Sequence, residues 1–277
     1  LFWLGLARVR VGDGAQARAA WERLRREFPD SLWSARAVAT LGRLAEGAAR
    51  WEEADRLYAL LIDRYPDSPR TDDARWRRAW LRYRHGRREE ARALFIRYGT
   101  AFPEAPRASA HLYWASRISS ERDRAAGAAL LRETAKRYPL TFYGQRARLR
   151  LGLPQLARAS TPRRALAPTS FEGTAEELAA LGFDAEALEE MESVSPDPVP
   201  TALRRLAAEL YARAGDATKS IGAVEPLVDA ALYGRRQLDD GLWRLAYPRA
   251  YWPQVFTSST SHGLDPLLVL AVIREES

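Results

Sequence analysis

Residues 65–86, YPDSPRTDDARWRRAWLRYRHG, contain the pattern that decides the fold. The residue before a proline avoids helical backbone angles, so Tyr65-Pro66 predicts the end of one helix. After the short turn PDS, residues 72–83 carry Ala, Trp, Leu and Tyr at helical spacing, which is typical of a helix–helix seam. Gly86 then predicts a break before the following helix. The stretch therefore predicts antiparallel helices joined by short turns.

The aromatic-proline pair recurs at a nearly constant interval. Its four copies place the prolines 37, 37 and 36 residues apart: Phe28-Pro29, Tyr65-Pro66, Phe102-Pro103 and Tyr138-Pro139. A period of this length with two helices in each repeat is typical of a solenoid, and it resembles the tetratricopeptide class, whose 34-residue consensus is followed only loosely. No segment alternates polar and apolar residues as a strand would. We therefore predict an all-α chain, with a tetratricopeptide-like superhelix over residues 1–158.

Clusters of proline separate this array from a second helical region. Pro154, Pro162 and Pro168 mark one break, and prolines at 196, 198 and 200 mark another. Between them, FEGTAEELAALGFDAEALEEMES predicts a helical hairpin that turns at Gly182 and Asp184. The segments TALRRLAAELYARAGD and GAVEPLVDAALYGRRQ continue as helices. Residues 159–255 are therefore predicted to form a helical linker domain.

Charge is divided between the two regions. Residues 1–170 hold 34 Lys and Arg against 18 Asp and Glu, whereas residues 171–277 hold 9 against 18. A basic region attracts polyanions, which include nucleic acid, anionic lipid surfaces and the carboxylate-bearing peptides of peptidoglycan. Many of these arginines lie close to an acidic residue in the sequence, as in WEEADR, which is typical of solvated helix faces.

Several functional classes find no support in the composition. The absence of cysteine excludes disulfides and thiolate metal sites, and His85, His111 and His262 show no ligand spacing. No stretch has the ~20 apolar residues of a membrane-spanning helix. The opening LFWLGLARVR lacks the features of a signal peptide and predicts the first helix of a repeat, so an export signal is expected upstream. GDGAQA, at 12–17, formally matches a dinucleotide-binding pattern, but no strand precedes it.

The last thirteen residues, DPLLVLAVIREES at 265–277, form a second informative stretch. Asp265 suits a helix N-cap and Pro266 the first helical position, and the apolar run that follows predicts a helix buried on most sides. Glu276 follows apolar residues at helical spacing, and burial there would raise the pKa of its carboxyl, as a general acid requires. Glu275 follows apolar residues in the same way, so periodicity leaves the choice between the two glutamates open.

Four segments resemble the soluble lytic transglycosylases, bacterial enzymes that cleave peptidoglycan: YPRAYWPQVF at 247–256, HGLDPLLVLAVIREES at 262–277, LYWASR at 112–117 and YPLTFYGQRARLRLG at 138–152. The resemblance implies that residues 256–277 begin a lysozyme-like catalytic domain. It assigns Glu276 as the single catalytic acid and base, and Ser277, its neighbour in the motif, to substrate binding. The family also expects a Gly-Leu-Met-Gln motif further on, so residues 1–277 alone are expected to be inactive.

The activity implied by this resemblance is a lyase reaction. The enzyme would cleave the β-1,4 bond between N-acetylmuramic acid and N-acetylglucosamine without water and leave a 1,6-anhydromuramoyl end. It would need no cofactor and no metal. Glycan strands of peptidoglycan are the expected partner, with cell-wall synthesis proteins as further partners, and the expected location is the periplasm or cell envelope.

Two other functions remain open at this stage. A non-catalytic repeat scaffold that binds protein or glycan would explain the repeats but not the Glu-Ser helix. A nucleic-acid-binding solenoid is suggested only by the basic region, and no nucleic-acid partner is expected. For aromatic residues such as Trp114 and Tyr143, packing between helices is the better prediction, with a few aromatic rings available to stack on sugars.

Overall fold

The computed structural model describes residues 1–154, 170–193, 199–233 and 238–276, with the side chains of 170–172 left out. All its regular elements over these ranges are helices, as predicted. The chain divides into two compact units: unit 1, Leu1–Gln155, and unit 2, Leu156–Ser277.

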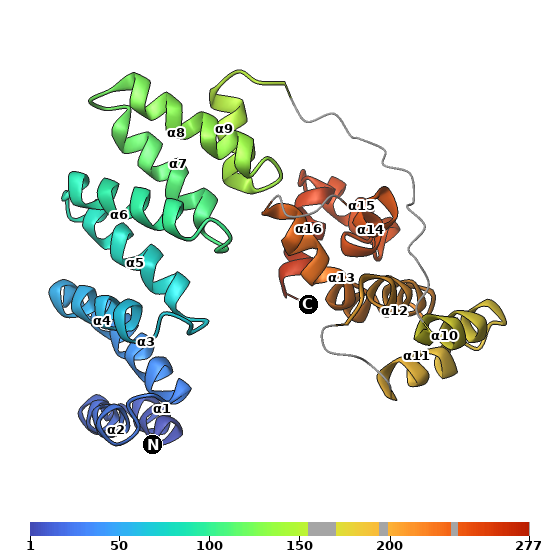
Figure 1. The fold of residues 1–277 in the computed structure, drawn as a ribbon, viewed down its shortest axis with the longest axis horizontal. Helices are drawn as coiled ribbons and strands as arrows, with labels where there is room; N and C mark the ends of the chain where they lie inside the picture. The colour runs from blue at the N-terminus through green and yellow to red at the C-terminus, as the bar shows by residue number, and fades with distance from the viewer. Residues whose placement is uncertain (155–169, 194–198, 234–237, 277) are drawn as a thin grey trace. The chain divides into compact units, whose positions relative to one another are not determined.

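Unit 1 is a linear array in which every helix packs against the next one in the sequence. Figure 1 shows these helices in chain order along the array, from α1 and α2 at one end to α8 and α9 at the other. The nine helices that the structure describes in this unit are α1 (Phe2–Arg10), α2 (Gly14–Glu27), α3 (Leu32–Gly47), α4 (Trp51–Arg64), α5 (Thr71–Arg84), α6 (Arg88–Ala101), α7 (Ala108–Ser119), α8 (Arg124–Arg137) and α9 (Phe142–Arg150). The predicted tetratricopeptide-like solenoid is confirmed.

The aromatic-proline pairs end helices as the sequence predicted. The aromatic residue of each pair is the C-cap of its helix, with extended φ angles between −124° and −134°: Phe28 after α2, Tyr65 after α4, Phe102 after α6 and Tyr138 after α8. In two repeats the next helix caps the aromatic residue in turn. Ser34 Oγ donates to the Phe28 carbonyl and Thr71 Oγ1 to the Tyr65 carbonyl, both at 2.6 Å. The same two carbonyls also accept hydrogen bonds from the backbone N–H groups of Ser31 and Ser68, so the turn and the next helix together satisfy each helix end.

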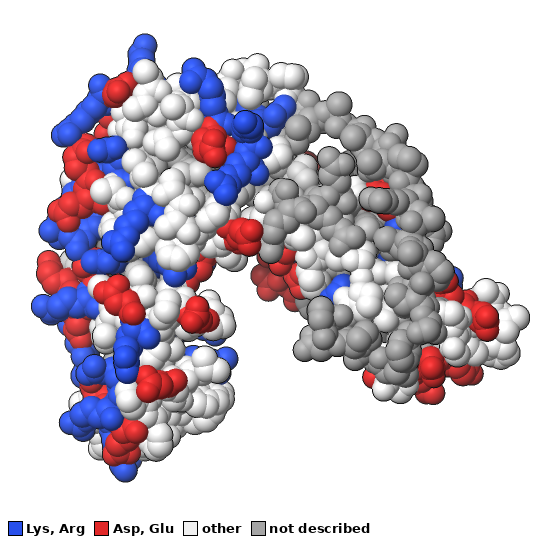
Figure 2. Space-filling model, in the orientation of Figure 1, with Lys and Arg blue, Asp and Glu red and all other residues white. Residues whose placement is uncertain are grey.

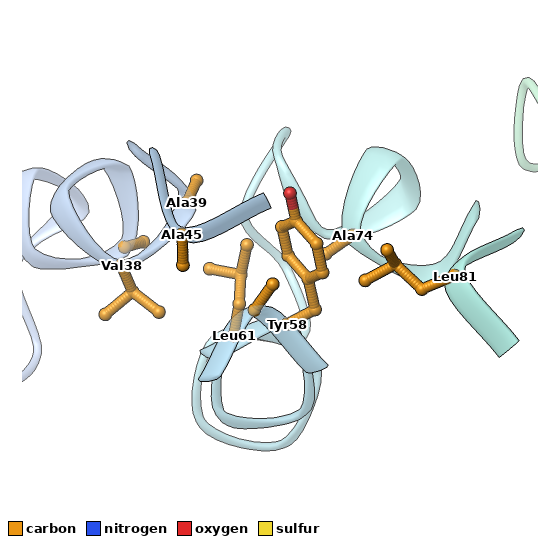
Figure 3. Packing of buried hydrophobic residues seen from close by; sticks show 9 residues of the cluster. Val38, Ala39, Ala45, Tyr58, Leu61, Ala74 and Leu81 are labelled. Atoms are coloured by element: carbon orange, nitrogen blue, oxygen red, sulfur yellow. The ribbon is translucent and has the colours of Figure 1, made fainter. Parts of the chain in front are cut away.

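Alanine and a few large side chains fill the seams between helices. In the cluster that joins α3, α4 and α5, residues of α3 lie to one side of two α4 side chains and residues of α5 lie to the other side (Figure 3), with Val38, Ala39 and Ala45 from α3, Tyr58 and Leu61 from α4, and Ala74 and Leu81 from α5. The Tyr58 hydroxyl donates to Glu46 Oε2 at 2.8 Å. Small residues let the helices approach closely, while the buried tyrosine keeps a hydrogen-bond partner.

Gly144, in the first turn of α9, has no room for a side chain. A Cβ atom at this position would lie 1.7 Å from the carbonyl oxygen of Tyr138, which is backbone and cannot move aside. We expect Gly144→Ala to lower the stability of unit 1 by about 1–3 kcal/mol or more, as overpacking does. Urea unfolding measures the loss, with Gly14→Ala as the control, because a Cβ there meets nothing within 4 Å. Equal stability of the two variants would contradict the packing described at α9.

His111, on α7, is buried as an apolar packing residue. It is 1% exposed, and its ring lies 5.5–5.6 Å from the rings of Trp76, Phe95 and Tyr98. Neither ring nitrogen has a hydrogen-bond partner among the described residues. Burial, followed by the nearby charges of Arg107 and Arg75, lowers the pKa of His111 to about 3.

This burial predicts a pH-dependent stability for unit 1. The unfolded chain binds the His111 proton below about pH 6.5, whereas the folded chain binds it only near pH 3, so stability falls as the pH drops through this window. The expected slope is about 1.4 kcal/mol per pH unit below pH 6.5. Urea unfolding followed by tryptophan fluorescence at pH 7, 6 and 5 measures the slope. In His111→Leu it should largely disappear over that range, and an unchanged slope would show that another group causes it.

Unit 2 contains seven helices over the residues described: α10 (Ser170–Ala180), α11 (Asp184–Ser193), α12 (Thr201–Arg213), α13 (Ala217–Leu232), α14 (Asp240–Ala246), α15 (Trp252–Ser261) and α16 (Pro266–Glu276). The predicted hairpin is present as α10 and α11, which turn at Gly182 with a φ of +87°. Helices α12, α13 and α14 enclose a second core around Val224, Val228 and Leu242.

The three-domain division predicted from the sequence stays a prediction. Its first boundary, between residues 158 and 159, lies outside the described residues, as do the prolines at 162, 168, 196 and 198. Its second boundary, between 255 and 256, falls within α15, and unit 2 includes the residues on both sides of it.

Candidate functional site

Helix α16 begins as the sequence predicted. The Asp265 carboxylate accepts a hydrogen bond from the backbone N–H of Leu267 at 2.8 Å, and Pro266 is the first helical residue. Gly263, with a φ of +68°, turns the chain between α15 and α16, which pack against each other. The apolar run that precedes the two glutamates is therefore one helix of a hairpin.

The predicted burial of α16 is wrong for the described chain. No residue of the helix is buried, and Leu267, Leu268 and Val272 are 55–59% exposed. Helix α15 packs along one side and leaves the other apolar positions open to solvent. The sequence period correctly identified an apolar helix, but it could not show whether other elements cover that helix.

The two glutamates at the end of α16 are both exposed, so the burial predicted for Glu276 is absent here. The side chain of Glu275 is 78% exposed, and its carboxylate lies 3.5 Å from the Arg274 guanidinium. Ser277 lies outside the described residues. The catalytic role of Glu276 and the substrate-binding role of Ser277 remain predictions from the resemblance.

A cavity of about 1280 Å³ lies beside α16 within unit 2. Its wall comes from the turn between α12 and α13, from residues 244–251 and from α16, and it includes the charged residues Asp216, Arg244, Arg249, Arg274 and Glu275. The wall as described includes Glu275 and stops short of Glu276. Glu275 therefore lines the cavity, although the resemblance assigns the catalytic role to Glu276.

Arg274 connects the end of α16 to the segment before α15. Its Nε donates to the Ala246 carbonyl at 3.2 Å, and its guanidinium lies 4.6 Å from the centre of the Tyr247 ring. Such a cation–π contact adds about 0.5–1 kcal/mol at an exposed site. Sequence reasoning missed this role of Arg274, although Arg274 and Tyr247 both lie in segments that carry the resemblance.

Tyr251 has an unusual backbone conformation at the cavity wall. Its φ of +53° lies in the left-handed region, which is uncommon for an aromatic residue, and its side chain is largely exposed. It is the N-cap residue of α15, where the chain leaves the Tyr247–Tyr251 segment. Tyr251 thus presents an exposed aromatic ring in a cavity wall that also contains Arg244, Arg249 and Arg274.

The aromatic residues considered for sugar stacking are packed between helices. The Trp114 ring lies 4.7 Å from that of Trp80 and 5.3 Å from that of Tyr83. Tyr143 lies 5.3 Å from Tyr113 in the seam between α7 and α9. Both Trp114 and Tyr143 are half-buried. Their arrangement agrees with the predicted packing role.

Many arginines of unit 1 form ion pairs with acidic residues of other helices. Arg77 joins α5 to Glu46 of α3 at 3.1 Å, and Arg82 joins α5 to Asp55 of α4 at 2.5 Å. Along the face of unit 1 shown in Figure 2, basic and acidic side chains alternate. The array therefore presents local charge pairs over most of its length, which argues against a continuous basic track for nucleic acid.

His85 and His262 are exposed and make local contacts. His85 packs against Trp51 with ring centres 4.7 Å apart, and an exposed His262 contacts the Ser258 carbonyl through Nδ1 at 2.8 Å. In the ranges that the structure covers, no three His, Cys, Asp or Glu residues converge as metal ligands. None of the helices described has the length and apolar character needed to cross a bilayer.

Comparison with known proteins adds one match to unit 1. The tetratricopeptide repeat family matches residues 1–31, 36–68 and 73–105, which cover α1 to α6. None of the curated proteins matches the chain. A tetratricopeptide repeat protein from Parabacteroides merdae ATCC 43184 has 16% identity, with 87% of this chain and 94% of that chain covered and a TM-score of 0.33, too low to support an argument. The resemblance to lytic transglycosylases has no support in these matches. The family match and the paired helices show a helical-repeat domain similar to tetratricopeptide arrays.

Proposed function

We propose that this chain is part of a peptidoglycan lytic transglycosylase in which Glu276 is the catalytic acid and base. The observation that carries the proposal is helix α16, an apolar helix capped by Asp265 that ends at Glu276, which Ser277 follows in the sequence. It follows the YPRAYWPQVF segment at 247–256, which Arg274 contacts through the Tyr247 ring. Together these residues match the entry into the catalytic domain of that family by resemblance.

In the proposed reaction, Glu276 first donates a proton to the oxygen between N-acetylmuramic acid and N-acetylglucosamine. The C1–O bond breaks, and the acetamido group of the muramoyl residue supports the positive charge at C1. The Glu276 carboxylate then removes the proton from the muramoyl 6-hydroxyl, and that oxygen bonds to C1. The proton returns to Glu276, no water is consumed, and the product carries a 1,6-anhydro ring.

The first step needs a carboxyl that is protonated near neutral pH and shielded from water. Glu276 is exposed in the described chain. The proposal therefore requires a further protein surface or bound substrate to cover the apolar side of α16. Removal from water would raise the pKa of the carboxyl into the range of a general acid.

The helical array has a binding role in this proposal. Unit 1 would contact glycan strands, and its exposed arginines would meet the carboxylates of peptide stems in salt-sensitive contacts. The protein would work in the periplasm or cell envelope, where its substrate lies, and cell-wall synthesis proteins are candidate partners. No metal or organic cofactor enters the proposed reaction.

A non-catalytic scaffold is the second candidate, and the tetratricopeptide match over residues 1–105 favours it. Arrays of this kind offer extended surfaces for binding proteins or other polymers. The scaffold explains unit 1 fully, but it gives no role to the Glu-Glu-Ser end of α16. The two candidates predict different outcomes for the same assay.

That assay incubates purified peptidoglycan sacculi with the product of the complete gene that encodes these residues. The transglycosylase proposal predicts soluble muropeptides in the supernatant, increasing with time and protein concentration. The scaffold predicts at most that the protein sediments with the sacculi while the supernatant stays free of muropeptides. Supernatant analysis by chromatography and mass spectrometry separates the two.

A further inference from the structure

The seam between α7 and α9 places a tyrosine hydroxyl among arginines. Tyr113, on α7, is only 4% exposed, and its ring packs 5.3 Å from the ring of Tyr143 on α9. Leu131 and Ala147 belong to the same buried cluster. The ring of Tyr113 is thus fixed by packing, which holds its hydroxyl in one place.

Three exposed arginines lie on the same helix sides as this ring pair: Arg117 follows Tyr113 by four residues on α7, and Arg146 and Arg150 follow Tyr143 by three and seven residues on α9. Burial by itself would raise the pKa of Tyr113, but contacts from Arg150, Arg117 and Arg146 lower it overall. Residues four apart lie on the same side of a helix, so Tyr113 and Arg117 are neighbours on α7, and Arg146 and Arg150 are neighbours on α9. The guanidinium of Arg117 also lies 5.8 Å from the Trp114 ring centre.

The described part of the chain provides no carboxylate partner for these three arginines. The acidic side chains nearby are engaged elsewhere: Glu121 with Arg88, Glu133 with Arg137, and Asp123 with the backbone at the start of α8. Residues 108–154 hold nine Lys and Arg against three Asp and Glu. Figure 2 shows basic side chains gathered over α9, in contrast to the mixed charges along the rest of that face.

We propose that Arg117, Arg146 and Arg150, with the hydroxyl of Tyr113, form a binding site for an oxyanion, either a phosphate or a carboxylate group. Guanidinium groups held close together repel one another, and a bound anion relieves this repulsion. Their planar forks suit the paired oxygens of carboxylate and phosphate, and the tyrosine hydroxyl supplies one more donor. The site does not depend on the proposed transglycosylase activity, because it lies in unit 1 and needs neither Glu276 nor a glycan.

Isothermal titration of the full chain at low salt tests the site with two kinds of anion. The first probe is inorganic phosphate, and the second is N-acetyl-dialanine with a free carboxylate, with the matching amide as its control. Saturable binding of either, with a dissociation constant of about 1 mM or lower, supports the site. Stronger binding of phosphate indicates a free or esterified phosphate as the ligand. Binding of the acid but not the amide indicates a peptide carboxylate.

Paired variants locate the binding. Arg146→Gln with Arg150→Gln should weaken it at least about ten-fold, and Tyr113→Phe should weaken it by a smaller factor. The matched control is Arg132→Gln with Lys136→Gln on α8, which removes the same charge from exposed positions and should leave the affinity within about two-fold. Circular dichroism confirms that each variant is folded. Absence of saturable binding, or equal losses in both double variants, would overturn the proposal.

Discussion

Replacing Glu276 by Gln is expected to reduce the release of anhydromuropeptides from sacculi by about 10²–10⁴-fold, the contribution of a general acid and base. Glutamine keeps the size of the side chain but cannot donate a proton to the glycosidic oxygen or remove one from the 6-hydroxyl. Both proposed steps therefore fail at the same residue. The rate is measured with the complete gene product by quantifying soluble muropeptides over time.

Glu275→Gln is the matched control, because Glu275 is also an exposed carboxyl at the end of α16. Its rate should stay within about ten-fold of the parent, since the resemblance assigns both proton transfers to Glu276 alone. Sequence periodicity did not separate the two glutamates, and the cavity wall includes Glu275. A large loss for Glu275→Gln with normal activity for Glu276→Gln would reverse the assignment.

Replacing Asp239 by Ala is expected to destabilise unit 2 by about 3–5 kcal/mol, as removal of one partner from a buried ion pair does. Arg205 Nη1 and Nη2 donate to the two oxygens of Asp239 at 2.7 and 3.1 Å. The side chains are only 8% and 10% exposed. Asp239 also caps α14 by accepting from the N–H of Leu242 at 3.0 Å. Alanine removes the cap and leaves Glu209 as the acidic partner of the arginine among the described residues.

Hydrogen exchange of the backbone amides of α12, α13 and α14, which enclose the core of unit 2, measures this loss when read by mass spectrometry. Combining Asp239→Ala with Arg205→Met should restore part of the stability, because no buried charge is then left without its partner. The contacts with Arg205 also lower the pKa of Asp239 against the opposing effect of burial. The pair therefore contributes fully above about pH 4 and less as the pH falls further. A loss below about 1 kcal/mol for Asp239→Ala would contradict the role of the pair.

Local rules in the sequence predicted the helices of unit 1. Proline restricts the residue before it, so the four aromatic-proline pairs identified four helix ends directly. The start of α16 was equally predictable, since Asp265 and Pro266 have short-range roles that need no knowledge of the fold. Repetition at 36–37 residues then indicated how such helices stack.

Contacts between residues far apart in the chain could not be predicted in this way. Arg205 and Asp239 are 34 residues apart, and neither stands out from the many charged residues around it. The arginines that surround Tyr113 become a group only when α7 packs against α9. The exposure of α16 was missed for a related reason. A helical period shows which side of a helix is apolar, but only the neighbouring elements decide whether that side is covered.

The chemistry of the cut muramoyl ends tests the central claim most directly. Sacculi are digested by the complete gene product in water labelled with oxygen-18 (heavy oxygen), and the masses of the products are measured by mass spectrometry. The transglycosylase proposal predicts muramoyl ends that are lighter by one water than hydrolysis products and contain no heavy oxygen. Reducing ends that carry heavy oxygen would show hydrolysis instead, and intact sacculi would leave unit 1 as a binding scaffold without the proposed activity.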